Sequence, residues 1–514
     1  MGFIAYSMME EMPTMLSPES PSVADARASE PVLVIRIAIL LFLFLNFLYL
    51  LVSPGRARSI DEIDPVFQSE SLLLRHTTAI PQAVKLGIYF GKRDLHGNAR
   101  SAWPFGHAVL VLPWAAVGNY LLERIPGITG QNDDLAHMAG TCWSNATYAA
   151  LAVAASFLLF LKLGNSRHSA LKSSLLLGLS TPLFLYSGWL FSEPVTTALF
   201  VVAALVLFGS GKEVSFSRAV VGALVLGFSI HVRPANLVTV LIFIAAALLL
   251  EQSQDGAIKY RTALILVAIV GISGAMYLAR NYVFFGNPFD FGVPTVVENG
   301  KNPDTWHNPF WRGAFGFLFS PGKSAFLFCP PAILGILGLP RLWRRNRALT
   351  VLAAAATPVN LVMYSFRTQW DGGYCIGPRY LVPGLVLLCL PIAALFQEPP
   401  GWFRPAFWIT AIVGFLVQAI SLSTNVLEDM VRNHYYVGNF EYRMSYSPLS
   451  GQLRLIWKYL HASPTVVGGG WDRWFLMLHA GGADSSVLAV IACLMLAGTL
   501  IFGILLRASV RDAS

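Results

Sequence analysis

The stretch that decides the fold runs from Val32 to Ser53 and reads VLVIRIAILLFLFLNFLYLLVS. It carries a single charge, Arg36, and is long enough to cross the roughly 30 Å hydrocarbon core of a bilayer. Further apolar runs follow at about 138–163, 170–186, 192–210, 217–232, 236–250, 262–279, 325–340, 349–364, 380–396, 404–424 and 485–506. The sequence therefore predicts an all-α polytopic membrane protein with about 12 transmembrane helices.

Composition and charge support this class. The chain has 514 residues, of which 55% are hydrophobic and 12% charged, about half the charge of a typical soluble domain. The net charge of +8 is concentrated in alternate short loops, most strongly between Arg341 and Arg347. This positive-inside pattern predicts an inner (plasma) membrane protein with both termini in the cytoplasm. It also excludes nucleic acid as a partner and leaves membrane lipids as the expected surroundings.

The polar segments divide the chain further. Residues 1–31 are expected to form a disordered cytoplasmic tail, and residues 32–514 a single transmembrane domain. Arg233-Pro234 separates two short runs, which form either two thin or tilted helices or one helix broken at the proline. Long loops outside the membrane are expected at about 54–137, 280–324, 365–379 and 425–484.

Three carboxylates stand just beyond the first span, in the sequence Asp61-Glu62-Ile63-Asp64. Carboxylates at a membrane face are suited to proton abstraction, which makes all three candidate catalytic residues. A structural alternative is also concrete. Ser59 with Glu62 fits a capping box, and Asp64 before Pro65 fits a helix N-cap. The two interpretations are compatible, because a helix start also orients a carboxylate.

The segment 365–379 combines Arg367, Trp370, Asp371 and Arg379 between two apolar spans. Arginine is costly at this depth unless it is paired, so partners are expected. The arginines could bind a phosphate, with Trp370 against a sugar or isoprenoid, whereas Asp371 could simply neutralise one of them.

Three more polar residues lie at the same expected face of the membrane. Lys323 follows a glycine at the outer end of a span and suits a lipid phosphate or, equally, an interfacial position. Glu193 precedes a proline; it is a candidate for binding the donor, but it could be no more than a helix cap. Arg233 could simply reach for the lipid headgroups.

Several motifs in a fixed order carry a family resemblance. The chain resembles the bacterial family 39-like branch of GT-C glycosyltransferases, which includes protein mannosyltransferases and lipid-A aminoarabinose transferases. The similarity covers about residues 32 to 460. It rests on the acidic cluster, Trp103-Pro104-Phe105-Gly106-His107, Arg233-Pro234, Phe285-Gly286-Asn287-Pro288 with Gly292, Phe319-Ser320-Pro321-Gly322 and Gly377-Pro378-Arg379-Tyr380.

The resemblance implies a GT-C bundle that takes a polyprenyl-phosphate-linked sugar and transfers it outside the cytoplasm, with inversion, to a lipid, glycan or protein hydroxyl. An acid in the first outer loop would act as base, in the order Asp61, Glu62, Asp64. The leaving phosphate would meet Arg233, Lys323, Arg367 and Arg379. Some members use a divalent metal, but this sequence offers no dense ligand set for one.

Two other functions compete with this one. A transporter or flippase for a lipid-linked glycan would show internal repeats and broken helices in matching halves. Of these features, the sequence shows only a possible helix break at Arg233-Pro234. An envelope polysaccharide polymerase or ligase would also use outer arginines, but it gives no special role to carboxylates after the first span.

Overall fold

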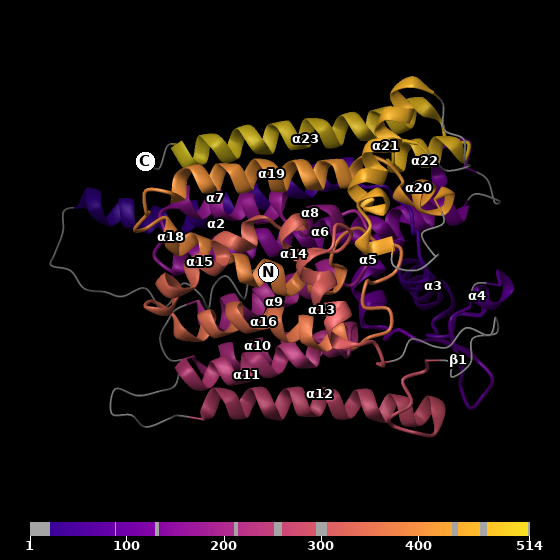
Figure 1. Ribbon diagram of the computed structural model, residues 1–514, viewed down its shortest axis with the longest axis horizontal. Coiled ribbons are helices and arrows are strands. Elements are labelled where there is room, and N and C mark those ends of the chain that lie inside the picture. Colours follow the sequence, from indigo (N-terminus) through magenta and orange to yellow (C-terminus); the bar gives the residue numbers. More distant parts are fainter. Residues whose placement is uncertain are drawn as a thin grey trace.

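The computed structural model describes residues 21–87, 89–128, 133–209, 214–250, 260–293, 306–433, 440–462 and 470–511. Long helices in this part of the chain run roughly parallel and form a bundle, with shorter elements gathered at one end (Figure 1). We call this end the loop end and the other the far end. The loop end carries α3 (Ile60–Arg75), α4 (Pro81–Lys85), β1 (Gly91–Arg93), α20 (Val426–Arg432) and α22 (Trp474–Ala480).

The remaining elements follow in chain order. The helices of eight or more residues are α2 (Pro21–Val52), α5 (Gly106–Tyr120), α6 (Asp133–Lys162), α7 (Arg167–Ser180), α9 (Glu193–Phe208), α10 (Phe216–Val232), α11 (Asn236–Leu250), α12 (Arg261–Phe285), α13 (Phe310–Phe319), α15 (Pro331–Trp343), α16 (Arg347–Ser365), α17 (Val382–Cys389), α19 (Phe403–Ser423), α21 (Pro448–His461) and α23 (Ser485–Arg511). The shorter elements are β2 (Ala99–Ser101), η1 (Leu122–Arg124), α8 (Pro182–Tyr186), α14 (Ala325–Phe328), η2 (Arg379–Leu381), α18 (Ile392–Leu395), η3 (Phe440–Tyr442) and η4 (Met444–Tyr446).

The prediction of an all-α membrane protein is confirmed. Each apolar run of the sequence coincides with one helix or with consecutive helices. In the described residues, six helices are long and apolar enough to span a bilayer, and five more apolar segments are shorter. The described strands form only a two-stranded antiparallel hairpin, in which Gly91 pairs with Ser101.

Prolines explain why several spans are interrupted. The runs at 170–186, 325–340 and 380–396 break at Pro182, at Pro330-Pro331 and at Pro391, respectively. Proline cannot donate the backbone hydrogen bond and clashes with the preceding turn, so each helix ends and a new one starts. Arg233 separates α10 from α11 with an extended backbone (φ −157°, ψ 117°), as expected for a residue before proline.

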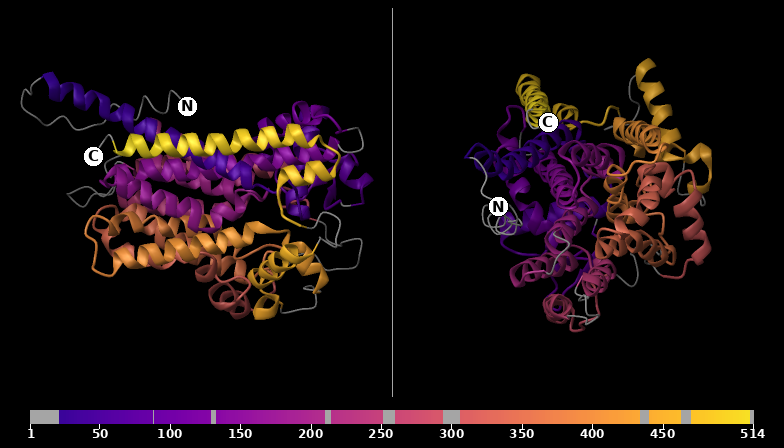
Figure 2. Two further views of the ribbon diagram at one scale, coloured as in Figure 1. Left: turned by 90° about the horizontal axis from the view of Figure 1, so that it is seen from above. Right: turned by 90° about the vertical axis from the view of Figure 1, so that its left-hand side faces the viewer.

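The outermost helices present apolar surfaces. α23 and α12 lie on opposite sides of the bundle, at the top and the bottom of Figure 1, and α23 lies nearest the viewer in the left view of Figure 2. Within their most apolar windows only 22% and 28% of the residues are buried inside the protein, against 72% for the central α6. Apolar surface of this extent is stable only in contact with lipid or another protein, which agrees with a position in the bilayer.

The first helix begins earlier than expected. Of the tail predicted over 1–31, residues 1–20 lie outside the described residues, and residues 21–31 belong to α2. Pro31 lies inside this helix. The polar composition of the segment therefore did not prevent it from continuing the first span as a helix.

One close helix contact gives a stability prediction. An added Cβ at Gly335 of α15 would clash with the carbonyl oxygen of Leu388 and lie 2.9 Å from its carbonyl carbon. Backbone atoms cannot rotate away, so Gly335→Ala should destabilise the protein by about 1–3 kcal/mol. Thermal unfolding in detergent measures the loss. Gly271→Ala is the matched control, because an added Cβ there meets no atom within 4 Å, and an equal loss in both variants would contradict the prediction.

Candidate functional site

The three acids after the first span have different surroundings. Glu62 is fully buried; its carboxylate accepts hydrogen bonds from the backbone N–H of Arg58 (3.0 Å) and of Leu190 (3.2 Å). Burial raises the pKa of Glu62 to about 7. Ser59 is the N-cap of α3, but its side chain makes no cap hydrogen bond to the helix backbone. The carboxylate of Glu62 accepts from the Arg58 N–H and the Ser59 hydroxyl instead, so the expected capping box is not formed. Glu62 therefore joins α3 to the turn before α9.

Asp64 is also buried, and it holds α3 against the hairpin. Its carboxylate accepts hydrogen bonds from Gln68 (3.0 Å) and from the Ser101 hydroxyl. The expected N-cap at Asp64-Pro65 is wrong, because α3 already begins at Ile60 and Pro65 lies inside it. The site role predicted for Asp64 gains no support from these contacts, which are all structural.

Asp64 should make stability depend on pH. Burial raises the pKa of Asp64 to about 7, whereas a free aspartate titrates near pH 3.9. Because the folded protein binds this proton more tightly than the unfolded chain, stability should be lost as the pH rises from about 4 to about 7. Asp64→Asn should remove this part of the dependence. Unfolding temperatures measured between pH 4 and pH 8 test it, and an unchanged slope in the variant would contradict the assignment.

Asp61 differs from both neighbours. Its side chain is 31% exposed, and its Oδ2 lies 2.5 Å from Nη2 of Arg379, whose own side chain is only 5% exposed. Asp61 is therefore the one acid of the three that combines exposure with an ion pair to a predicted phosphate-binding residue. The arrangement favours the first choice made from the sequence.

Three arginines surround one tyrosine. Arg367 Nη1 and Arg379 Nη2 both donate to the Tyr380 hydroxyl, over 2.6 Å and 3.1 Å. The guanidinium carbon of Arg233 lies 4.9 Å from the centre of the Tyr380 ring. Tyr364 stacks on that ring at 4.3 Å between centroids. We call Arg233, Arg367, Arg379 and Tyr380 the arginine cluster.

Glu193 connects two members of the cluster. Its Oε1 lies 2.6 Å from Arg233 Nη1 and 3.6 Å from Arg379 Nε. Its Oε2 is buried and has no hydrogen-bond partner among the described residues. A buried acceptor without a partner is uncommon in proteins, which makes this oxygen a candidate contact for a ligand hydroxyl.

Local sequence explains how these residues reach one place. Glu193 is the first residue of α9 and is followed by Pro194, a favoured residue in the first turn. Arg379 lies two residues after Gly377, which adopts the left-handed conformation (φ 72°) and packs on Phe328. A side chain at position 377 would be strained and would clash with that ring, so glycine is required for this turn.

Three predicted site residues have other roles in the structure. Lys323 is fully buried, and its ammonium donates to the carbonyl oxygens of Gly373 (3.1 Å) and Cys375 (2.8 Å). The predicted phosphate contact of Lys323 is therefore not supported, because carbonyl oxygens of the 365–379 segment already accept the hydrogen bonds of its ammonium group.

Trp370 and Asp371 are likewise structural. Trp370 is buried, with its ring edge-on to Phe317 at 5.2 Å, so its predicted contact with sugar or isoprenoid is not supported. Asp371 accepts a hydrogen bond from the Gly373 backbone N–H (3.0 Å) and stabilises a turn. No ion pair between Asp371 and an arginine is observed within the described residues.

No model of a known protein family matches the chain, and no curated protein matches it. Two solved structures are similar in shape. The crystal structure of ArnT from Cupriavidus metallidurans bound to undecaprenyl phosphate has 14% identity and a TM-score of 0.41, covering 93% of this chain and 77% of that one. The apo structure of the same protein has 14% identity and a TM-score of 0.43, covering 94% and 75%. At these values the function has to be inferred from the side chains of this chain.

The structure also adds residues to which the sequence gave no role. Tyr380 stood in a quoted motif, and its position next to Arg379 was the available signal. Asp472 binds both Arg56 (2.9 Å) and Arg58 across more than 400 residues of sequence, and nothing local in the sequence marks it. No group of three or more His, Cys, Asp or Glu side chains in the described ranges could hold a metal.

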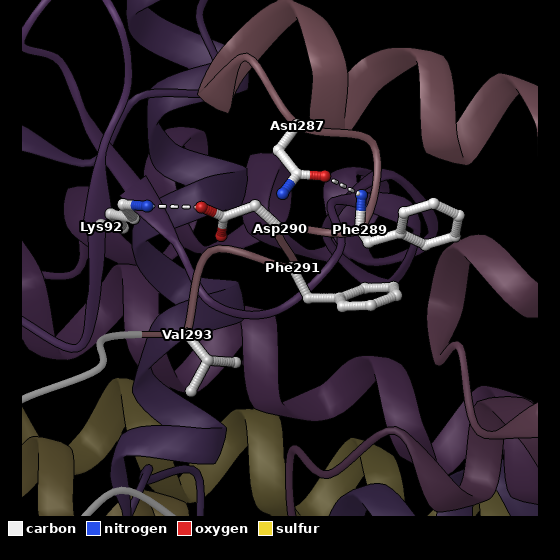
Figure 3. Close-up of a pocket in the computed structure, with 6 residues that line it drawn as sticks. All are labelled: Lys92, Asn287, Phe289, Asp290, Phe291 and Val293. Atoms are coloured by element: carbon white, nitrogen blue, oxygen red, sulfur yellow. Dashed lines mark hydrogen bonds and ion pairs between the residues drawn. The ribbon is translucent and has the colours of Figure 1, made fainter.

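A separate hollow lies beside the hairpin. Its volume is about 340 Å³, and the segment after α12 supplies most of its wall (Figure 3). Lys92 of β1 forms an ion pair with Asp290 across it. The other lining residues are Asn287, Phe289, Phe291 and Val293. No member of the arginine cluster lines this hollow.

Proposed function

We propose that this protein is a GT-C-type inverting glycosyltransferase. It moves a sugar from a polyprenyl-phosphate donor to an acceptor hydroxyl, with the loop end on the extracytoplasmic side of the membrane. The observation that carries the proposal is the ion pair of the partly exposed Asp61 with Arg379, beside the other guanidinium groups of the arginine cluster. A proton acceptor and a phosphate-binding group are then adjacent.

The arginine cluster has the chemistry for a phosphate. The guanidinium groups of Arg233, Arg367 and Arg379 gather around Tyr380, and the carboxylates of Asp61 and Glu193 pair with Arg379 and Arg233. Guanidinium is planar, always charged and able to bind two phosphate oxygens at once. The phenol oxygen that now accepts from Arg367 and Arg379 marks a position where an anionic oxygen would meet the same donors.

The proposed reaction follows from this arrangement. Asp61 takes the proton of the acceptor hydroxyl, and the resulting oxygen attacks the anomeric carbon from the face opposite the phosphate. The bond from that carbon to the phosphate oxygen breaks, and polyprenyl phosphate leaves with the bonding electrons. Fixed cations in a site shielded from water stabilise the charge that develops on the leaving group. The unpaired Oε2 of Glu193 can accept a hydrogen bond from a sugar hydroxyl.

A lipid donor agrees with the surroundings of the cluster. α13 packs close to α16 through Gly313, which faces the backbone of Ser365, two residues before Arg367. The opposite face of α13 exposes Trp311 (78%), Phe315 (55%) and Phe319 (65%). Exposed aromatic residues at such a position are typical of the membrane interface. A polyprenyl tail could therefore stay in the bilayer while its headgroup enters the cluster.

A transfer assay tests the proposal. Purified protein in lipid vesicles is offered a panel of radiolabelled polyprenyl-phosphate hexoses and pentoses with an extract of envelope acceptors. We expect one donor to release its label to an acceptor, with inverted configuration in the product. Turnover of no donor, together with saturable binding of an intact lipid-linked oligosaccharide, would instead indicate a polymerase, ligase or transporter.

A further inference from the structure

A second charged feature lies at the far end of the bundle, where α15 ends and α16 begins. Here a pocket of about 220 Å³ is lined by Trp343, Arg344, Arg345, Asn346 and Arg347, with Leu249 of α11 on its apolar side. All three arginines are exposed. The proposed reaction uses none of these residues.

Two hydrogen bonds fix the position of this pocket. Asn346 donates from Nδ2 to the carbonyl oxygen of Phe208, the last residue of α9, over 2.8 Å. Its Oδ1 accepts from the Leu349 backbone N–H over 2.9 Å and so caps α16. Because α9 begins at Glu193, beside the arginine cluster, the pocket lies about 24 Å from that cluster along the helix.

Within the described residues, no carboxylate pairs with the charges of the pocket. No ion pair in the described part of the chain involves Arg344, Arg345 or Arg347. The guanidinium carbon of Arg347 lies 5.7 Å from the centre of the Trp343 ring, its one observed charge-related contact. The first N–H groups of the 19-residue α16 add positive potential to the pocket.

We propose that this pocket binds the phosphate headgroup of an anionic phospholipid in the leaflet at the far end of the bundle. Arginines would contact the phosphate, and Leu249 and the half-exposed Trp343 would contact the glycerol and the start of the acyl chains. A free phosphate ion would satisfy the arginines but leave this apolar wall unused. Basic pockets between transmembrane helices are a recurrent form of headgroup site.

The test uses the full chain in nanodiscs of phosphatidylcholine with increasing fractions of phosphatidylglycerol. Lipid bound to the protein is counted by native mass spectrometry. We expect saturable binding of phosphatidylglycerol that is weakened at least tenfold in the triple variant Arg344→Gln, Arg345→Gln, Arg347→Gln. The matched control removes three other exposed arginines of the far end, as Arg261→Gln, Arg404→Gln, Arg507→Gln, and should bind as the wild type does.

Each other outcome overturns the proposal. Equal weakening in both triple variants would mean that lipid responds to the overall surface charge. Absence of any preference for phosphatidylglycerol in the wild type would mean that no such site exists. Inorganic phosphate that competes with the lipid at equal concentration would mean that the pocket binds a free anion. Unfolding temperatures in pure phosphatidylcholine, expected to be unchanged, show that both variants remain folded.

Discussion

Asp61→Asn should reduce sugar transfer by roughly 10²–10⁴-fold, the usual contribution of a general base. The loss should appear in kcat and leave the apparent donor KM close to that of the wild type. Asparagine keeps an oxygen that can accept from Arg379, so the cluster should retain its geometry, but the amide cannot take up the acceptor proton. Initial rates at varied donor and acceptor concentrations measure both constants.

Glu70→Gln is the matched control for this variant. It removes one carboxylate from the same helix as Asp61. Glu70 pairs with the exposed Arg75 at 2.7 Å and not with a member of the arginine cluster. Its activity should equal that of the wild type. Full activity of Asp61→Asn would refute the assignment of the base, and loss in Glu62→Gln with unchanged unfolding temperature would transfer the role to Glu62.

Arg379→Ala should have the second large effect, which is a loss of affinity for the donor. This side chain contacts Asp61, Glu193 and the Tyr380 hydroxyl at once. Its removal takes one guanidinium from the proposed phosphate site and leaves two carboxylates without this cation. We therefore expect the apparent donor affinity to fall by about two orders of magnitude, in line with the roughly 2–5 kcal/mol lost in binding when one partner of a buried charge pair is truncated. Titration of binding with a non-transferable polyprenyl phosphate measures it.

Two further variants make this experiment specific. Arg379→Lys should restore little affinity, because one ammonium cannot reach all three partners in the directions that the planar guanidinium reaches. Arg93→Ala removes an exposed arginine from the same end of the molecule and should bind donor normally. If Arg379→Ala and Arg93→Ala bound equally well, Arg379 would have no part in donor recognition.

Much of the fold could be predicted from the sequence, because the bilayer constrains it. Each span must be long and apolar, so its position is visible in the sequence as a continuous run of apolar residues. The interruptions at Pro182, Pro330-Pro331 and Pro391 follow from the chemistry of one residue type. The start of α2 at Pro21 could not be predicted, because local polarity does not show how far a helix continues outside the hydrocarbon.

The site could be predicted only in part. Asp61, Glu193, Arg233, Arg367 and Arg379 were expected at one face because each stands at the end of an apolar run, and the structure brings all five into connected contacts. Lys323 and Trp370 satisfied the same rule, and yet Lys323 binds the backbone of Gly373 and Cys375 and Trp370 packs on Phe317. Whether a polar side chain joins this cluster or turns toward a neighbouring backbone depends on contacts distant in sequence, which no local pattern encodes.

The anchoring of the first turn of α3 has one more consequence. Arg58 is bound to Asp472, Glu62 to the Leu190 backbone, and Asp64 to Ser101. Asp61 therefore lies on a segment that three separate parts of the chain hold in position. The amide hydrogens of Glu62 and Ile63, which donate to the Ser59 carbonyl, should exchange slowly with deuterated water. The opening that admits and releases reactants must then come from other segments, while the Asp61 carboxylate stays in place.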